Sequence, residues 1–261
     1  MSETAIIVIP ARMASTRFPN KPMVFIRGKT MIERMWQIGK AAGGHEVVIA
    51  TDDERLKRFA EGFGAKVVMT SPDCVTGTDR VAEVARLMGT DQSVFFSLQG
   101  DAVLTPPWVI EEVLRGMLAN PSIRMATPAV LLKDRALQEF IAQKKRGSSS
   151  GTTVVFNQTG DALYFSKALI PYSRNEEDPD RPIYRHIGLY AYRKETLERL
   201  SSLPEGRLER WEKLEQLRAL ENGIPIRIVV VDYRGRTHGS VDRPEDVAVV
   251  EAAIVREGEL V

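Results

Sequence analysis

The sequence predicts an α/β protein with a Rossmann-like, mostly parallel sheet flanked by helices and a smaller mixed α/β subregion. Short apolar runs alternate with segments of helical spacing through the first half of the chain. This alternation is typical of parallel strands joined by right-handed crossovers. After about residue 124 the strands follow one another more closely. We expect a single domain over residues 1–261, with a mixed-sheet subregion at about 124–206.

The first half of the chain supplies the parallel core. Its four apolar runs are predicted strands, at Ala5–Ile9, Glu46–Ala50, Lys66–Met69 and Ser93–Leu98. Segments of helical spacing lie between or beside them, at Met31–Ala41, Asp53–Glu61 and Asp79–Met88. Pro106, Pro107 and Trp108 are expected to open another helix, because proline is tolerated in the first helical turn.

The second half contains more varied elements. Strands are predicted at Arg124–Leu132, Thr152–Phe156, Ala162–Ser166 and His186–Tyr192, with a β-rich run at Pro225–Val231. A helix is expected at Arg207–Glu221, ended by Asn222-Gly223, and a final helix at Pro244–Arg256. The polar segments Lys144–Gly151 and Asn175–Pro182 are interpreted as surface loops, the first with a mobile flap or a species-specific contact as alternatives.

Composition limits the class of protein. The 36 basic and 35 acidic side chains give a net charge of +1, so no nucleic acid and no anionic membrane is expected as a partner. The single cysteine, Cys74, cannot form an internal disulfide, which fits a reducing compartment. No apolar run is long enough to span a bilayer and no secretory leader is visible. We therefore expect an enzyme of the cytoplasm with no membrane insertion.

Three cations follow the first predicted strand. Arg12, Arg17 and Lys21 lie in a proline-punctuated segment that also holds Ser15. Ligands of doubly wound sheets bind beyond the carboxyl ends of the strands, and converging cations call for an anion. We interpret this segment as one wall of a triphosphate site.

Two aspartates are candidate metal ligands. Gln99-Gly100-Asp101 ends an apolar strand, and Asp242 stands just before a proline-initiated helix. Taken alone, Asp101 fits an ordinary turn and Asp242 fits a helix N-cap. A magnesium–triphosphate site, however, needs few protein carboxylates, because phosphate oxygens and water complete the octahedron.

Three further segments are unusually polar. Strand alternation places His186, Gly188, Tyr190 and Tyr192 on one face, although a lone histidine is more often structural. Helical spacing places Glu209, Glu212 and Gln216 on one flank, where a solvated face is an equal alternative. Gly77-Thr78-Asp79-Arg80 opens a helix that either meets an anion or base edge or is simply capped. Cys74 fits a small, partly buried residue better than a nucleophile.

In this order, the motifs resemble the 3-deoxy-manno-octulosonate (KDO) cytidylyltransferases, also called CMP-KDO synthetases. The resemblance runs from about residue 5 to residue 250 with similar spacing. The matching elements are Ile9-Pro10-Ala11-Arg12 through Lys21-Pro22, Ala50-Thr51-Asp52, Gly77-Thr78-Asp79-Arg80, Gln99-Gly100-Asp101, Ala162-Leu163-Tyr164-Phe165-Ser166, Ile170-Pro171, Arg185-His186-Ile187-Gly188, Leu214-Glu215-Gln216-Leu217-Arg218, and Val241-Asp242 with Pro244-Glu245-Asp246.

The resemblance implies a Mg²⁺-dependent enzyme of GT-A-like fold that joins CTP to a free 3-deoxy-2-ulosonic acid and releases pyrophosphate. It also implies a homodimer, with subregion 124–206 contributing to the sugar site and the dimer contact. The implied triphosphate residues are Arg12, Ser15, Arg17 and Lys21, with Arg80 near the nucleotide and Asp101 and Asp242 on magnesium. Of these, Arg12, Lys21, Asp101 and Asp242 are the implied catalytic set. The implied sugar-acid residues are Gln99, Lys167, His186, Tyr190, Glu212 and Gln216.

Several positions depart from the family pattern. Ala102 and Val103 follow Asp101 where Glu-Pro is usual, Cys74 replaces a histidine, and Lys167 replaces an arginine. Lysine lacks arginine's bidentate fork. The sequence therefore predicts an active cytidylyltransferase whose acceptor is KDO, a related ulosonic acid or another small acid. Two alternatives stay open: a glycosyltransferase that consumes a nucleotide sugar, and a non-catalytic paralogue that binds a nucleotide or a protein.

Overall fold

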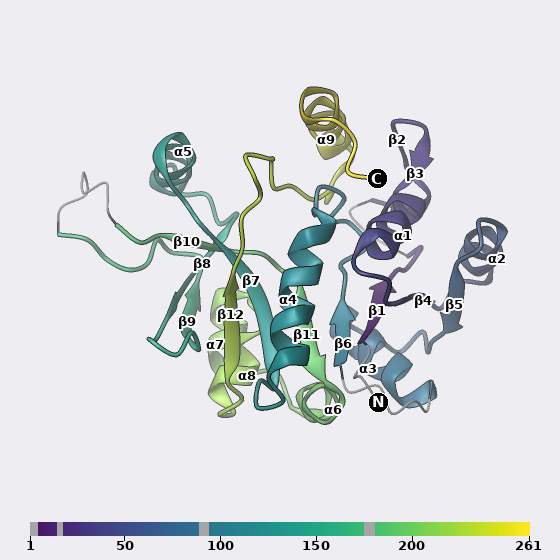
Figure 1. Cartoon of the computed structure of the whole chain (residues 1–261), viewed down its shortest axis with the longest axis horizontal. Coiled ribbons are helices and arrows are strands. Elements are labelled where there is room, and N and C mark those ends of the chain that lie inside the picture. The colour runs from purple at the N-terminus through teal and green to yellow at the C-terminus, as the bar shows by residue number, and fades with distance from the viewer. Residues whose placement is uncertain (1–4, 15–17, 89–93, 175–180) are drawn as a thin grey trace.

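A ten-stranded mixed sheet runs through the molecule, with helices on both faces (Figure 1). The computed structural model describes residues 5–14, 18–88, 94–174 and 181–261. The strands of this sheet are β1 (Ala5–Pro10), β4 (Glu46–Thr51), β5 (Lys66–Met69), β6 (Val94–Ser97), β7 (Met125–Leu131), β8 (Thr152–Phe156), β9 (Ala162–Ser166), β10 (Tyr184–His186), β11 (Tyr190–Arg193) and β12 (Ile226–Val230). A small separate sheet pairs β2 (Phe25–Ile26) with β3 (Lys29–Thr30).

The helices include most of those expected and some that were not. They are η1 (Lys21–Met23), α1 (Met31–Ala41), α2 (Glu54–Gly62), α3 (Gly77–Leu87), α4 (Pro107–Ala119), α5 (Asp134–Lys145), α6 (Lys194–Ser202), α7 (Arg207–Glu212), α8 (Leu217–Glu221) and α9 (Pro244–Glu257). Side-chain caps explain several helix starts. Thr76 and Asp79 form a capping box at the start of α3, for example.

The sheet has a parallel half and an antiparallel half. Its order is β5-β4-β1-β6-β11-β7-β10-β8-β9, with β12 also paired to β7. Strands β5, β4, β1 and β6 are all parallel, as the alternating pattern predicts. From β11 onward the neighbours are antiparallel, apart from the parallel pair of β7 and β12. The predicted fold class is confirmed, and the change of rhythm near residue 124 marks the change of pairing.

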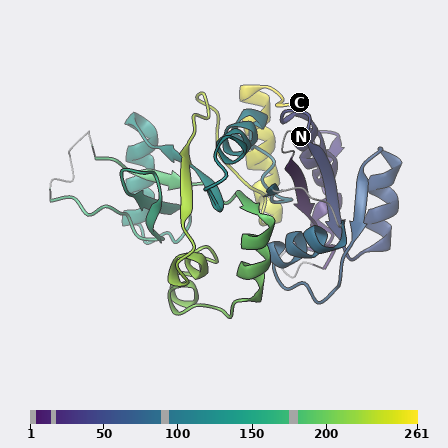
Figure 2. The same ribbon diagram turned by 60° about the horizontal axis from the view of Figure 1, so that its bottom comes forward.

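Each face of the sheet has its own core. Ile7, Ile9 and Phe96 point to one face and pack with buried side chains of α1, α4 and α9. Ile6 and Val8 point to the other face and pack with buried side chains of α3, α6 and α8. This period-2 alternation within a fully apolar run is what a strand covered on both sides requires. Figure 2 shows the two helical layers on either side of the strands.

The predicted helix Arg207–Glu221 is wrong as a single element. It is two helices, α7 and α8, because Lys213 adopts a left-handed conformation with φ of 53°. A non-glycine residue in that region ends a helix. Glu209, Glu212 and Gln216 therefore do not share one helical flank.

The predicted strand His186–Tyr192 is also wrong as a single element. It is split into β10 and β11, because Leu189 N–H donates to the Ile187 carbonyl over 2.7 Å and turns the chain. The hydroxyl of Thr127 donates to the carbonyls of Ile187 and Leu189 and fixes that turn.

Two helices were missed, α5 and α6. The segment Lys144–Gly151 was expected to be a loop, yet Lys144 and Lys145 belong to the last turn of α5 and the loop begins at Arg146. The other expected loop, Asn175–Pro182, falls largely on residues 175–180, outside the described residues. Subregion 124–206 shares the ten-stranded sheet with the rest of the chain, and its division from the rest stays a prediction.

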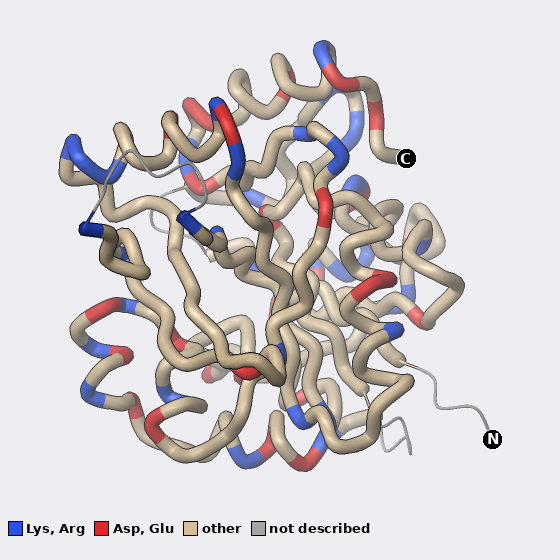
Figure 3. The backbone as a smooth tube through the Cα atoms, turned by 60° about the vertical axis from the view of Figure 1, so that its left-hand side comes forward, with Lys and Arg blue, Asp and Glu red and all other residues tan. Residues whose placement is uncertain are grey.

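The distribution of charged residues over the surface agrees with the balanced composition of the sequence. Basic and acidic residues are interspersed along the outer helices and loops, as Figure 3 shows. Among the described residues, we find no helix long and apolar enough to cross a membrane.

Candidate active site

A polar pocket opens at the carboxyl ends of β1 and β6. It has a volume of about 250 Å³. It brings together six of the residues singled out from the sequence, Arg12, Lys21, Arg80, Gln99, Asp101 and Asp242. Ser15 and Arg17, which were predicted beside them, lie outside the described residues.

Close contact between two strand ends shapes this pocket. A Cβ atom at Gly100 would lie only 2.9 Å from the carbonyl oxygen of Pro10. Glycine is therefore required where the segment after β6 passes the end of β1. The next residue, Asp101, accepts a backbone hydrogen bond from Val241 N–H over 3.0 Å. That bond brings the chain leading to Asp242 to the same edge of the sheet.

Lys21 lies between the two aspartates. Its Nζ atom is 2.6 Å from Asp101 Oδ2 and 3.8 Å from Asp242 Oδ1. The Lys21 side chain is 17% exposed, and those of Asp101 and Asp242 are 28% and 48% exposed. One ammonium therefore meets two carboxylates at the mouth of the pocket. Opposite charges held this close and partly dry attract more strongly than they would in water.

Asp242 does not cap the following helix. The N-cap residue is Arg243. Asp246, in the first turn of α9, accepts through Oδ2 from the backbone N–H groups of Asp242 and Arg243, each over 2.8 Å. The carboxylate of Asp242 is left facing Lys21, with Ser240 Oγ at 3.4 Å from its other oxygen. The N-cap interpretation of Asp242 is therefore wrong.

Arg80 is buried at the back of the pocket. It is 3% exposed, its Nη1 donates to Thr70 Oγ1, and its Nη2 lies 3.3 Å from Asp52 Oδ2. Sequence reasoning gave no role to Asp52, although the residue belongs to the matched Ala-Thr-Asp motif. A buried arginine needs a carboxylate nearby, and the only signal in the sequence was that both residues stand in recognisable motifs.

Cys74 lines the pocket as a protonated thiol. Its Sγ donates to Glu83 over 2.8 Å, and Glu83 also accepts from the backbone N–H of Ser71 over 2.9 Å. Burial, followed by the hydrogen bond with Glu83, raises the pKa of Cys74 to about 12. A thiol so far from ionisation is a poor nucleophile. Cys74 therefore acts as a wall and a hydrogen-bond donor.

Beside the pocket, a row of rings crosses the antiparallel strands. The ring of His186 lies 4.9 Å from that of Phe165 and 5.6 Å from that of Tyr190, and Tyr190 lies 5.9 Å from Tyr192. The expected clustering of His186, Tyr190 and Tyr192 is therefore present, although two strands rather than one supply it.

The row of rings adjoins the pocket through Gln99. Tyr190 pairs with Ser97 across β11 and β6, and the Ser97 hydroxyl accepts from Gln99 Nε2 over 3.2 Å. Gln99, which lines the pocket, is thus a neighbour of the ring row.

His186 is a neutral, buried histidine. It is 7% exposed, and its Nε2 lies 2.8 Å from Thr127 Oγ1. Burial lowers its pKa to about 3. The imidazole therefore stays uncharged near pH 7 and offers hydrogen bonding rather than positive charge.

Glu212 and Lys167 lie beside Ser166, next to the Phe165 end of this row, and Gln216 is a further predicted sugar-acid residue. The Glu212 carboxylate accepts from Ser166 Oγ over 2.6 Å and from the Lys167 backbone N–H over 2.9 Å. Gln216 is 4% exposed, and its Nε2 has no hydrogen-bond partner among the described residues. The Lys167 side chain lines a separate hollow of about 400 Å³ with Lys144 and Arg181. Five predicted sugar-acid residues therefore lie outside the first pocket.

The fold and this pocket together define a nucleotidyltransferase. The sheet is open and largely parallel where ligands bind beyond its strand ends, and the pocket there combines cations with paired aspartates. The model of one family, Cytidylyltransferase, matches residues 6–228. The chain belongs to the cytidylyltransferase family.

Known relatives match almost the whole chain. The 3-deoxy-manno-octulosonate cytidylyltransferase of Maricaulis maris is 51% identical over 99% of this chain and 100% of the relative. The 8-amino-3,8-dideoxy-manno-octulosonate cytidylyltransferase of Shewanella halifaxensis is 40% identical over 95% of this chain and 97% of the relative. Among solved structures, CMP:2-keto-3-deoxy-manno-octonic acid synthetase complexed with CTP superposes with a TM-score of 0.85 at 37% identity. That match covers 97% of this chain and 99% of the solved one.

Proposed function

We propose that this enzyme transfers CMP from CTP to the anomeric hydroxyl of a 3-deoxy-2-ulosonic acid, KDO or a close relative, and releases pyrophosphate. The observation that carries the proposal is the placement of Lys21 between Asp101 and Asp242 in a pocket beyond the strand ends. Relatives named for KDO and for its 8-amino analogue both match the chain at 40% identity or more. We therefore assign the acceptor only to the class of 3-deoxy-2-ulosonic acids.

The reaction joins two anions. A bond forms between the anomeric oxygen and the α-phosphorus, the bond to the bridging oxygen of the β-phosphate breaks, and the hydroxyl proton is released. Neither substrate approaches the other until charge is neutralised. Arg12 and Lys21 would supply that neutralisation on the nucleotide side, where both line the pocket. Positioning and electrostatics then account for most of the catalysis.

The residues present fit a divalent metal, and Mg²⁺ suits their chemistry. Two carboxylates reach one cationic atom, Lys21 Nζ, so the site concentrates negative charge. The described residues contain no group of three or more His, Cys, Asp or Glu side chains that could hold a metal by themselves. Asp101 and Asp242 would hold Mg²⁺ as its two protein ligands, and phosphate oxygens and water would supply the remaining ligands. When bound, the ion would neutralise charge on the triphosphate and lower the pKa of the attacking hydroxyl.

We assign the binding site of the acceptor to the row of rings and the side chains around it. Tyr190, His186 and Gln216 would present neutral hydrogen-bonding groups to the sugar hydroxyls, and Gln99 would stand between the two substrates. Glu212 would accept from a hydroxyl, and Lys167 would supply a positive charge to the carboxylate of the acid. An unpaired buried amide such as that of Gln216 costs about 1–3 kcal/mol, a cost that a bound hydroxyl would remove.

The test is pyrophosphate release from CTP and Mg²⁺, measured with KDO, with 8-amino-3,8-dideoxy-manno-octulosonate, with other small acids and with no acid. We expect release that depends on an ulosonic acid and is abolished by EDTA. UTP, ATP and GTP in parallel would measure base preference. CTP binding without turnover of any acid would favour a non-catalytic paralogue, and hydrolysis of a nucleotide sugar would favour a glycosyltransferase.

A homodimer and a location in the cytoplasm stay predictions. The enzyme uses small, charged substrates, which fits such a location. Size-exclusion chromatography with light scattering would measure the oligomeric state, for which we expect two chains.

A further inference from the structure

Two residues of the proposed acceptor site lie on either side of a broken helix. Glu212 ends α7, and Gln216 immediately precedes α8. Between them, Lys213 takes the left-handed conformation that ends α7. The relative placement of the two side chains is therefore not fixed by one regular helix, and another interaction must hold the two short helices together.

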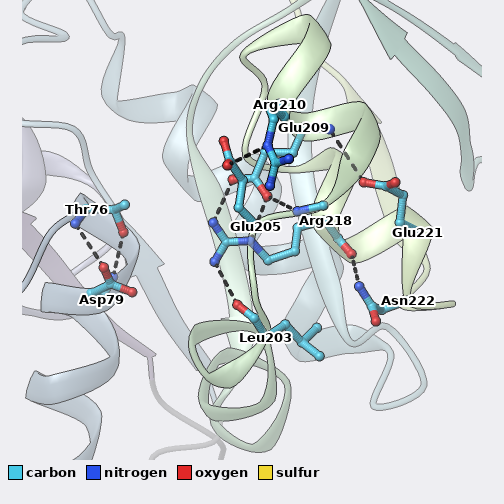
Figure 4. Close-up of polar contacts among 10 residues, drawn as sticks. Thr76, Asp79, Leu203, Glu205, Glu209, Arg210, Arg218, Glu221 and Asn222 are labelled. Atoms are coloured by element: carbon cyan, nitrogen blue, oxygen red, sulfur yellow. Dashed lines mark hydrogen bonds and ion pairs between the residues drawn. The ribbon is translucent and has the colours of Figure 1, made fainter.

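A buried ion pair joins these helices. Arg218 of α8 donates from Nε to Glu209 Oε2 over 2.8 Å and from Nη2 to Glu209 Oε1 over 2.6 Å. The side chains are 10% and 9% exposed. Both bonds are drawn in Figure 4, where the guanidinium of Arg218 faces the carboxylate of Glu209. A bidentate, charge-assisted pair of this kind fixes orientation as well as distance.

Further bonds complete the connection. Glu209 Oε2 also accepts from Gly206 N–H over 2.9 Å, and Arg218 Nη1 donates to the Leu203 carbonyl over 3.4 Å. At the other end, the Glu221 carboxylate of α8 accepts from the first amides of α7, with Leu208 N–H at 3.0 Å. Polar groups of the pair are thus well satisfied, as a buried ion pair requires.

Neither partner of the pair belongs to the proposed substrate contacts. Both side chains of the pair are satisfied by protein groups, whereas Gln216 Nε2 is not. Glu212, on the same helix as Glu209, accepts hydrogen bonds from the Ser166 hydroxyl and the Lys167 backbone N–H, which belong to the segment at the end of β9. A small rotation of α7 against α8 would move Glu212 and Gln216 relative to each other.

We propose that the Glu209–Arg218 ion pair is the positioning device of the acceptor site, which holds Glu212 and Gln216 at the separation that the sugar acid needs. This inference rests on the proposed function, since it assigns an acceptor role to these two residues. Glu209 and Arg218 are positioning residues and act only through their neighbours. Neither Glu209 nor Arg218 lines the pocket that holds Lys21 and Asp101, so we expect the loss of the pair to affect the acceptor more than CTP.

The test compares four variants by steady-state kinetics in both substrates and by calorimetric CTP binding. Arg218→Met removes both hydrogen bonds to Glu209, and the bond to the Leu203 carbonyl, while keeping most of the side-chain bulk. Arg218→Lys keeps the charge without the planar fork, and Glu209→Gln keeps the shape without the charge. Arg210→Met is the matched control, because Arg210 on α7 pairs with Glu205 at the surface, over 3.1 Å. Exposed pairs of this kind contribute little.

We expect Arg218→Met and Glu209→Gln to lower kcat/KM for the acceptor by about tenfold or more, with the Kd and KM for CTP changed by less than about twofold. Arg218→Lys should be intermediate, and Arg210→Met should match the wild type. Equal losses for both substrates, or unchanged acceptor kinetics in folded variants, would overturn the proposal. If Arg218→Met does not fold, the other two variants carry the test. A wild-type protein that uses no ulosonic acid would instead refute the proposed function.

Discussion

The proposed nucleotide pocket and the proposed acceptor region of this enzyme are built in different ways. The pocket lies where the parallel strands β1 and β6 end together. Its charged groups come from the segments after these strands, from η1 and α3, and from the turn before α9. The acceptor region depends on a split strand, a broken helix and an ion pair between short helices. The first is charged and partly exposed to solvent, whereas the second combines the buried, neutral groups of His186 and Gln216 with the half-buried Glu212 and Lys167.

This difference reflects what each region is proposed to bind. A triphosphate is recognised by cationic side chains and a metal ion. These interactions work in the presence of solvent and do not require a closely shaped pocket. A sugar acid is recognised through several hydroxyls, and neutral groups such as His186 must be held at set positions in a dry site. The two regions should therefore respond to different substitutions, and the following predictions measure how separate they are.

The largest effect is expected for Asp101→Asn. The substitution removes one of the two carboxylates that meet Lys21, and with it a proposed metal ligand. We expect kcat to fall by about 10²- to 10³-fold, as when one electrostatic stabiliser is removed from an active site. Glu195→Gln, at an exposed ion pair with Arg124, serves as the control and should leave kcat unchanged. An Asp101→Asn enzyme with wild-type kcat would exclude the metal role.

The next effect is expected for Lys21→Met, which removes the cation between the aspartates. We expect the KM for CTP to rise by about 10- to 100-fold, the value of a hydrogen bond to a charged group. The KM for the acceptor should change by less than about threefold, because its proposed ligands lie elsewhere. Steady-state kinetics with each substrate varied separately would measure both. Similar increases in the two constants would show that the regions are not separate.

Part of the acid sensitivity should arise in the acceptor region, at His186, since burial also lowers the pKa of His238, to about 3. The pKa of His186 is about 3 in the folded protein, against about 6.5 in an unfolded chain. The unfolded state therefore binds more protons between these values. The contribution of neutral His186 to stability is complete above about pH 6.5 and is lost as the pH falls towards 3, by at most about 1.4 kcal/mol per pH unit.

Urea unfolding of the His186→Gln variant from pH 7 to pH 4 would measure this contribution. The free energy of unfolding should fall less steeply with decreasing pH than it does in the wild type. The control is His45→Gln. Partial burial lowers the pKa of His45 and Glu111 opposes that effect, so this substitution should change the pH dependence of the free energy of unfolding less than His186→Gln does. A wild-type slope in His186→Gln would contradict the account.

The smallest effect is expected for Lys167→Arg. The Lys167 backbone N–H contacts Glu212, and its backbone carbonyl accepts from Lys144 Nζ over 2.6 Å. Neither contact depends on the side chain, which lines a separate hollow. We expect the acceptor KM to change by no more than about threefold, because arginine keeps the positive charge. A larger change confined to the acceptor would place the Lys167 side chain on the sugar acid.

The two strand-end residues of the proposed nucleotide pocket could be predicted from the sequence, because each follows a strand. Asp101 ends an apolar run and Arg12 follows another, so parallel topology brings them together without further information. The pairing of Arg80 with Asp52 needed knowledge of packing, although both residues stand in recognisable motifs.

The acceptor region was less predictable because long-range contacts override local patterns there. Residues Arg207–Glu221 have helical spacing throughout, yet Lys213 breaks the helix and the Glu209–Arg218 pair stabilises the break. The split between β10 and β11 depends on the hydroxyl of Thr127, about 60 residues earlier in the chain. Neither contact leaves a signal in local periodicity.

The mass of the product formed from CTP, Mg²⁺ and KDO, or its 8-amino analogue, tests the central claim most directly. We predict a conjugate of CMP and the acid, formed with loss of water relative to the two components and with one pyrophosphate per conjugate. Recovery of unchanged CTP and acid with both acceptors, from protein shown to be folded, would contradict the account.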